Sequence, residues 1–177
     1  MTADQRPDHV DAIVAQWATE RPELDTTALA LVGRLMLTAT LAEEVLVPPL
    51  RERGLEPGWL DVLAALRRSG PRHELNPKHL LETVMLSSGG MTKRLDQLER
   101  AGLVKRSPDP GDRRGTLVRL TPRGRRTIDG AIEAHVDNEQ RLLAPLDAAE
   151  RRALDALLRK LLAGVERART GDVEEAA

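Results

Sequence analysis

The sequence contains no cysteine, no phenylalanine, no tyrosine and only two tryptophans among its 177 residues. Without cysteine the chain can form no disulfide, no thiolate metal site and no cysteine nucleophile. With so few aromatic side chains it is poorly equipped to bind single-stranded nucleic acid by base stacking. It also lacks any run of 18 or more apolar residues, and its acidic N-terminus lacks an apolar signal core, so we expect no membrane span and a cytoplasmic location.

Motifs for catalysis and for metal or cofactor binding are missing as well. The four histidines are scattered along the chain without the spacing of a metal site. There is no glycine-rich phosphate loop, no His-Glu-x-x-His pair and no nucleophile motif. The sequence therefore predicts a protein that is not an enzyme and that uses neither a metal nor another cofactor.

Charged residues are abundant but unevenly distributed. The formal net charge is −1, which by itself argues against a nucleic-acid partner. Residues 1–60, however, hold five arginines and ten acidic residues, a net charge of −5, whereas residues 93–126 hold eleven basic and four acidic residues, a net charge of +7. A basic segment in an otherwise acidic chain is typical of a protein that binds a polyanion. A solvated charged surface would give the same counts, but if the partner is a nucleic acid, duplex DNA suits this chain best.

Hydrophobic periodicity, capping residues and turn residues predict a helical chain interrupted by one hairpin. We expect the long second helix to stop before Pro48-Pro49, since proline cannot donate a helical hydrogen bond. The expected elements are helices at residues 10–20, 27–47, 57–69, 77–86 and 87–100, strands at 103–107 and 116–120, and two long helices that begin at Thr121-Pro122 and at a capping box of Asp147 with Glu150.

The two short helices of residues 77–100, followed at once by a basic hairpin, are typical of a helix-turn-helix with a wing. In the second helix the apolar residues Met91, Leu95 and Leu98 share one face, which we expect to be buried. The opposite face is small and polar and suits the DNA major groove, while the hairpin arginines suit the minor groove. The predicted DNA contacts are Ser88, Gly89, Gly90, Thr92, Lys93, Arg113 and Arg114. The alternative is a helical hairpin on a β-turn without a DNA-binding role.

The predicted fold class is mainly α with a small β-hairpin wing (α+β), in which a winged helix-turn-helix lobe joins a helical dimerisation region. We expect an N-terminal helix and first dimerisation helix in residues 1–56, the DNA-binding lobe in residues 57–121, and C-terminal dimerisation helices with a short tail in residues 122–177. The helices of residues 27–47 and 122–165 carry more apolar positions than one small lobe can cover. This predicts a homodimer on a pseudo-palindromic site.

The stretch from Leu86 to Val104 and the wing from Asp109 to Gly124 closely resemble the MarR family of transcriptional regulators. The resemblance spans about residues 27–165, and the pair of Asp112 and Arg114 looks like the wing signature of that family. It implies an obligate dimer built from the first and last long helices, acting as a repressor that a small anionic ligand or an oxidant releases. Because the chain has no cysteine, a thiol-based response to oxidants is excluded.

Four further residues allow a structural or a functional interpretation. Arg94 lies at the edge of the inward stripe, where it either joins an internal ion-pair network or extends to a phosphate. Asp61 fits the dipole-favoured start of a helix, Trp17 a core anchor and Arg106 a wing–phosphate contact. As a set they are similar to the ligand residues of the urate-responsive branch of the MarR family. The resemblance implies a ligand site formed by Trp17, Asp61, Arg94 and Arg106.

In that interpretation Asp61 pairs with an arginine until an organic anion such as urate arrives beside it. The segment after Trp17 looks shorter than in the branch, and related regulators with similar N-termini respond to other anions, such as tricarboxylic acids. The sequence thus predicts a sequence-specific dimeric regulator of duplex DNA, a repressor released by a small anion and without a membrane partner. The alternative is an architectural DNA-binding protein that has no effector.

Overall fold

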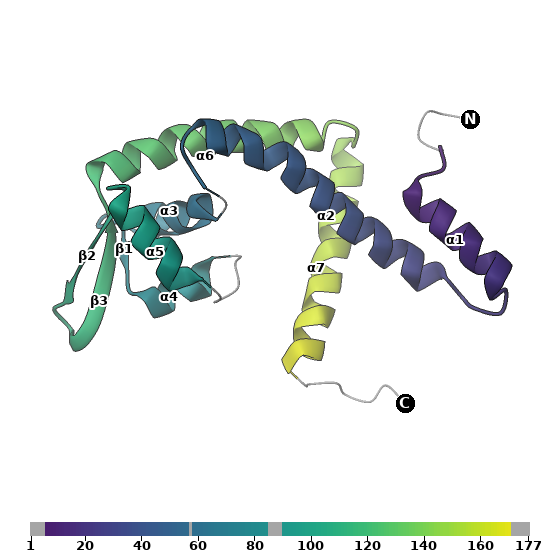
Figure 1. Cartoon of the computed structure of the whole chain (residues 1–177), viewed down its shortest axis with the longest axis horizontal. Helices are drawn as coiled ribbons and strands as arrows, with labels where there is room; N and C mark the ends of the chain where they lie inside the picture. Colours follow the sequence, from purple (N-terminus) through teal and green to yellow (C-terminus); the bar gives the residue numbers. More distant parts are fainter. Residues whose placement is uncertain (1–5, 57, 85–89, 171–177) are drawn as a thin grey trace. The chain divides into compact units, whose positions relative to one another are not determined.

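A computed structural model of the chain describes residues 6–56, 58–84 and 90–170, with only the backbone of residues 113 and 114 (Figure 1). The chain divides into two compact units, residues 1–135 and 136–177. Within the described ranges, no helix is both long and apolar enough to cross a membrane.

The fold is mainly helical with one small antiparallel sheet, as the sequence predicts. The elements follow the order α1 (His9–Glu20), α2 (Thr27–Glu52), α3 (Trp59–Arg68), β1 (Glu74–Leu75), α4 (Pro77–Thr83), α5 (Met91–Arg100), β2 (Val104–Asp109), β3 (Asp112–Leu120), α6 (Pro122–Leu142) and α7 (Ala148–Thr170).

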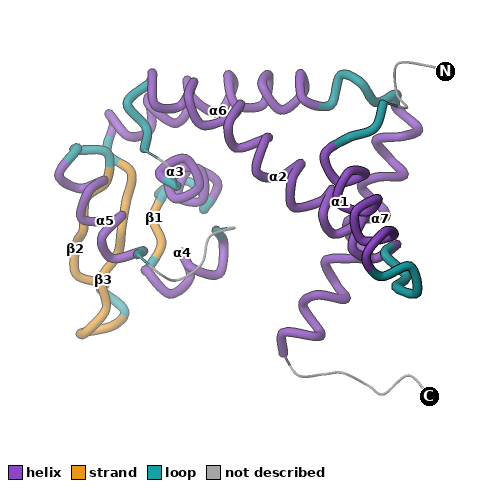
Figure 2. Tube along the Cα trace, turned by 45° about the vertical axis from the view of Figure 1, so that its right-hand side comes forward, coloured by secondary structure: helices purple, strands orange, loops and turns teal. Residues whose placement is uncertain are grey.

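One hydrophobic core lies among α3, α4, α5, the sheet and the first half of α6 (Figure 2). Its fully buried side chains include Leu66 of α3, Leu80 of α4, Leu98 of α5, Val118 of β3 and Ile128 of α6. Burying a leucine or isoleucine side chain contributes about 1.5–3 kcal/mol. These helices therefore form, with the sheet, a lobe that buries its own apolar faces.

The sheet has the strand order β1-β3-β2, so β3 pairs with both neighbours. The two-residue strand β1 was not expected from the sequence. The hairpin is also longer than expected, because Pro108 lies within β2 opposite Thr116 instead of in the turn. An edge strand tolerates a proline, which lacks a backbone N–H, and the pairing register shifts directly after it, between Pro108 and Asp109.

The expectation that the second helix stops before Pro48-Pro49 is wrong, since α2 continues to Glu52 with both prolines inside it. The two prolines lie close to the end of the helix, so the two backbone N–H donors that they lack are missing only there. Other contacts stabilise the last turn. Leu50 is buried in the lobe core. The Arg53 guanidinium donates to the carbonyl oxygen of Pro49 at 3.0 Å, and the Arg53 backbone N–H donates to that of Leu50 at 3.0 Å.

The short helices of the helix-turn-helix are shorter than expected. α4 ends at Thr83, because Val84 already has an extended backbone. α5 begins only at Met91, since Gly90 has a left-handed backbone with φ 85° and cannot belong to the helix. The prediction of one continuous helix over residues 87–100 is therefore wrong, while residues 87–89 themselves lie outside the described part of the chain.

The caps predicted at Thr121 and at Asp147 with Glu150 are confirmed, and Asn76 caps α4. Asn76 accepts the backbone N–H of His79 at 2.8 Å, and Thr121 Oγ1 accepts that of Gly124 at 2.9 Å. At the start of the last helix the Asp147 backbone N–H donates to the Glu150 carboxylate at 2.7 Å, and the Glu150 N–H donates back to Asp147 at 2.9 Å. These bonds satisfy N–H groups that a helix leaves free at its start.

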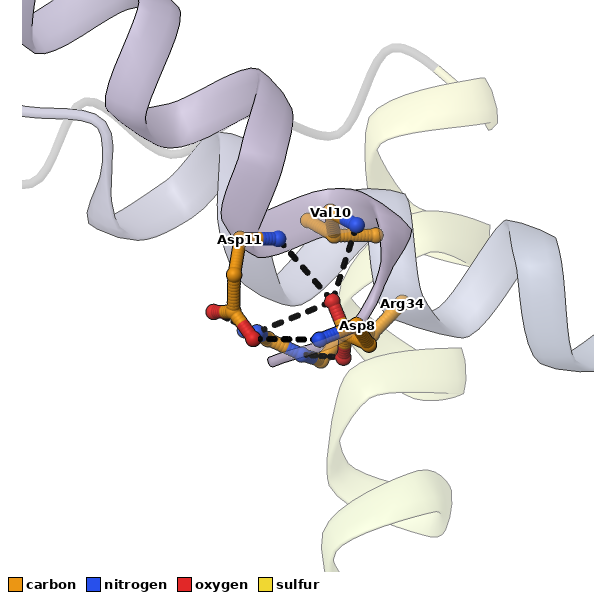
Figure 3. Close-up of polar contacts among 4 residues, drawn as sticks. All are labelled: Asp8, Val10, Asp11 and Arg34. Carbon is orange, nitrogen blue, oxygen red and sulfur yellow. Dashed lines mark hydrogen bonds and ion pairs between the residues drawn. The ribbon is translucent and has the colours of Figure 1, made fainter. Parts of the chain in front are cut away.

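The first helix is fastened to α2 by one apolar contact and one charge cluster. Val10 is only 3% exposed and packs where Gly33 of α2 leaves room for it. Beside it, Arg34 binds the carboxylates of Asp8 and Asp11 (Figure 3). Asp8 is also the cap of α1, since it accepts the N–H groups of Val10 and Asp11 at 2.8 and 2.9 Å.

In the second unit, α7 has an apolar stripe but no buried residue. Its leucines recur at the spacing of one helix face, and Leu157 is 66% exposed. Large apolar side chains on one helix face usually mark an interface.

Candidate functional site

The predicted recognition helix α5 has one buried and one exposed face, as its sequence pattern indicates. Met91, Leu95 and Leu98 are buried in the lobe core. Thr92 and Lys93 are exposed in the first turn, directly after Gly90. The helix therefore presents a small hydroxyl and a cation at its N-terminal end, where the helix dipole also favours phosphate.

The remaining predicted DNA contacts are placed only in part. Ser88 and Gly89 lie outside the described residues. Arg113 and Arg114 follow the start of β3, next to the hairpin turn at residues 110–111, while their side chains are not described. Two consecutive arginines near the tip of a hairpin are suited to a narrow, negatively charged minor groove.

Arg106 of β2 lies in an ion-pair cluster with α5. Its guanidinium is 2.5 Å from the Asp96 carboxylate and 3.3 Å from that of Glu99. Its backbone N–H also donates to Glu99 at 2.9 Å. Because both carboxylates belong to α5, the cluster fixes α5 against the hairpin.

This cluster was missed in the sequence, where Arg106 was interpreted as a phosphate or ligand contact. The alternation of side chains along the strand could have indicated that Arg106 faces α5. Val104 and Arg106 are two residues apart and therefore share a face of the sheet. Since Val104 is buried, the side chain of Arg106 points toward the same helical layer.

Arg94 occupies a different environment, on the side of α5 near the start of α3. It forms neither an ion pair nor a side-chain hydrogen bond within the described residues, so the predicted internal ion-pair network is not found. Its Nη1 is buried without a hydrogen-bond partner. The guanidinium lies so close to Gly58 that a Cβ atom there would be 2.7 Å from Nε.

An open hollow of about 430 Å³ lies beside Arg94. Its other lining residues are Glu56, Trp59, Gly90, Lys93 and Gln97. A buried guanidinium nitrogen without an acceptor is unfavourable by about 1–3 kcal/mol or more. The hollow is thus lined by Arg94, whose buried Nη1 lacks an acceptor, by the exposed cation Lys93 of α5 and by the carboxylate of Glu56.

The structure does not join the four residues of the predicted ligand site. Trp17 is 41% exposed on α1, so it does not anchor the core of the chain. Asp61 is half-buried in the first turn of α3. Among the described residues no hydrogen bond or ion pair connects any two of the four, and the expected pair between Asp61 and an arginine is absent.

Comparison with known proteins gives a consistent result. A sequence profile of the MarR family matches residues 53–115. The chain is 36% identical over 149 residues to the HTH-type transcriptional regulator PecS of Dickeya dadantii, an alignment that covers 84% of this chain and 90% of PecS.

Two solved structures share the fold. A cysteine-to-serine mutant of MarR from E. coli, complexed with operator DNA, gives a TM-score of 0.68 at 28% identity, covering 77% of this chain and 97% of that one. BpsR of Bordetella bronchiseptica, whose DNA binding is regulated by 6-hydroxynicotinic acid, gives 0.65 at 26% identity, covering 72% and 89%. These proteins are transcriptional regulators and not enzymes.

Proposed function

Because this chain belongs to the MarR family of DNA-binding transcriptional regulators, we propose that it is a homodimeric repressor. In this proposal the dimer binds a pseudo-palindromic operator and a small organic anion releases it. A regulator of this kind acts where the DNA is, so we place it in the cytoplasm. The observation that carries the proposal is the exposed first turn of α5, backed by a buried apolar face and fixed to the hairpin by Arg106.

The proposed DNA interface has two parts. Ser88, Gly89, Gly90, Thr92 and Lys93 address the major groove. Arg113 and Arg114 address the adjacent minor groove. Small residues before α5 allow its N-terminus to approach the DNA backbone closely, and the fixed geometry between α5 and the hairpin allows both grooves to be contacted at once.

The interface is tested by measuring binding to the protein's own promoter over a range of salt concentrations. Lys93→Gln should weaken binding and reduce the slope of log K against log salt by about 1, because one cation is lost from the DNA interface. Arg100→Gln is the matched control, since Arg100 is an exposed cation at the other end of α5. The Arg113→Ala, Arg114→Ala double variant should also lose affinity. Unchanged affinity and slope in Lys93→Gln would contradict the interface.

Exposed apolar faces support the proposed dimer. On α2, Leu31, Val32 and Met36 are more than half exposed, and α7 has no buried residue at all. A second copy covers such faces in an isologous interface. Two-fold symmetry then places the two recognition helices in successive major grooves, about 34–36 Å apart.

We place the effector in the hollow beside Arg94. An anion there gains the Arg94 guanidinium and the Lys93 ammonium, two positive charges against the single carboxylate of the lining, Glu56. It would bind beside α5, the helix that carries the proposed DNA contacts. The resemblance adds Trp17, Asp61 and Arg106 to the site. Arg106 is already paired with two carboxylates of α5. It would therefore affect ligand binding indirectly, because it holds α5 in position. The ligand can lower the affinity for DNA only as far as it binds the DNA-free form of the protein more tightly than the DNA-binding form.

A titration of the protein–DNA complex identifies the effector and its site. The anions to be compared are urate, citrate, trans-aconitate, salicylate and 6-hydroxynicotinate. Arg94→Gln should raise the effective anion concentration at least tenfold, while Arg100→Gln should respond like the wild type. Trp17→Ala, Asp61→Asn and Arg106→Ala show which other residues of the set take part.

Two results would contradict the effector proposal. If Arg94→Gln responds to the effective anion like the wild type, the ligand site lies elsewhere. If no anion releases the DNA at millimolar concentration, the protein is the effector-free architectural DNA-binding protein of the alternative prediction.

A further inference from the structure

Strand β3 runs directly into helix α6 (Figure 1). A second hollow, of about 480 Å³, lies where β3 ends and α6 begins. Its polar lining consists of His73, Arg119, Thr121, Arg125 and Arg126. The hollow is separate from the recognition helix and from the hairpin turn. Along β3, Arg119 is seven residues from Asp112, which is about 23 Å at the rise of a strand.

The positive charge of this hollow is only partly neutralised. Arg119 donates two hydrogen bonds to Glu74, at 2.8 and 2.5 Å. The hydrogen bond from Arg119 holds the pKa of the Glu74 carboxyl below its usual range, so this carboxylate stays charged and balances Arg119. Two guanidiniums, those of Arg125 and Arg126, remain to be balanced.

Neither of these two arginines has a strong carboxylate partner. The nearest carboxylate to Arg125 is that of Asp129, at 3.8 Å. Asp129 is bound more closely by Arg67, at 2.6 Å. Arg126 forms no ion pair within the described residues. The hollow therefore has a net positive charge that the chain itself does not compensate.

His73 is the most unusual residue of this lining. It has a left-handed backbone with φ 51°, which is uncommon for a residue other than glycine. A hydrogen bond stabilises this strained backbone: the N–H of Leu120 donates to the carbonyl oxygen of His73 at 3.0 Å. The ring nitrogen Nδ1 is buried without a hydrogen-bond partner. Rotation about χ2, a broad torsion in histidine, can turn this nitrogen toward a ligand.

We propose that this hollow binds a phosphate group, carried either by a small phosphorylated anion or by DNA that flanks the operator. Guanidinium groups match the oxygens of a phosphate in pairs, and a histidine N–H supplies a further donor. The hollow also lies at the start of α6, where the helix dipole favours an anion. The second source rests on the proposed function in DNA binding, whereas the first does not.

Binding of inorganic pyrophosphate to the full-length protein, measured by calorimetry, tests the first source. The Arg125→Gln, Arg126→Gln double variant should lose at least tenfold in affinity. His73→Asn should lose several-fold, and asparagine tolerates the left-handed backbone that His73 adopts. The matched control is Arg123→Gln, an exposed arginine of the same helical turn that does not line the hollow. Circular dichroism confirms that each variant is folded.

Operator fragments with and without an additional 10 base pairs on each side test the second source. If the phosphate belongs to DNA, the double variant should lose affinity and up to about 2 in salt slope on the long fragment, at about 0.9 for each phosphate contact. It should bind the short fragment like the wild type, which would show that the main interface is intact. If the double variant matches Arg123→Gln with pyrophosphate and with both fragments, the hollow is not a phosphate site.

Discussion

The DNA-binding lobe and the long helices that flank it bury their apolar residues in different ways. Every fully buried side chain of the described chain lies between Leu55 and Ile128. By contrast, the 26-residue helix α2 has a single buried residue, Leu50, and the 23-residue helix α7 has none. The lobe is therefore stabilised by its own residues, whereas in the proposed dimer a second copy of the chain covers the apolar faces of α2 and α7.

The largest expected effect is in the lobe core. Leu98→Ala removes a fully buried side chain of α5 and should lower the free energy of unfolding by about 2–5 kcal/mol, because the core cannot fill the cavity completely. Leu24→Ala, at an exposed loop position, is the control and should change it by less than about 0.5 kcal/mol. Chemical denaturation measures both. Equal losses would contradict the burial of Leu98 in the core of the lobe.

The next effect concerns α7. Leu157→Glu with Leu161→Glu places two charges on its apolar stripe and should raise the dimer dissociation constant at least a hundredfold, because a dimer interface would desolvate them. Sedimentation at micromolar concentration should then show a monomer. Lys160→Glu, a polar position on the same helix, should leave the dimer intact. A wild-type protein that sediments as a monomer would remove the need for a second copy.

A third prediction concerns the ion pairs that hold α5 against the hairpin. Arg106→Gln removes both ion pairs between β2 and α5. The loss of these charged hydrogen bonds should cost about 1–2 kcal/mol and weaken operator binding by roughly 5–30-fold, since the helix and the hairpin would no longer be held in one geometry. Lys105→Gln, the neighbouring exposed cation of β2, is the control. If Lys105→Gln weakens binding as much, Arg106 acts only through its charge.

The sequence was a good guide wherever the determining interactions are local. Caps at Thr121 and Asp147 depend on residues three positions away, and both were predicted correctly. The buried face of α5 followed from its helical periodicity. Two errors came from treating proline as a stop signal at Pro48 and Pro108, although contacts from elsewhere, or a place on an edge strand, can tolerate it.

Features that depend on distant residues could not be predicted. A Cβ at Gly124 would lie 1.9 Å from the carbonyl oxygen of Leu103, so α6 can approach the loop before β2 only because this residue is glycine. The packing of Gly58 on Arg94 has the same character. Both contacts join segments that are far apart in the sequence, and neither segment alone indicates them.

The smallest expected effect concerns the attachment of α1 to α2. The hydrogen bond from Arg34 lowers the pKa of the Asp8 carboxyl. A group whose pKa is lower in the folded state contributes stability above its unfolded pKa, about 4, and that contribution is lost as the pH falls through the folded value. The attachment should therefore weaken below pH 4. Because Asp8 is exposed, the change should be small and should decrease with salt.

Asp8→Asn separates the ion pair from the helix cap, because asparagine caps a helix about as well as aspartate but carries no charge. With Trp59→Phe in the background, Trp17 becomes the single tryptophan and its fluorescence reports on α1. Between pH 6 and pH 2 this signal should change less in Asp8→Asn than in its parent, and Arg34→Gln should behave like Asp8→Asn. Identical curves in all three proteins would show that Val10 alone holds α1 to α2, through the same kind of apolar contact that stabilises the lobe.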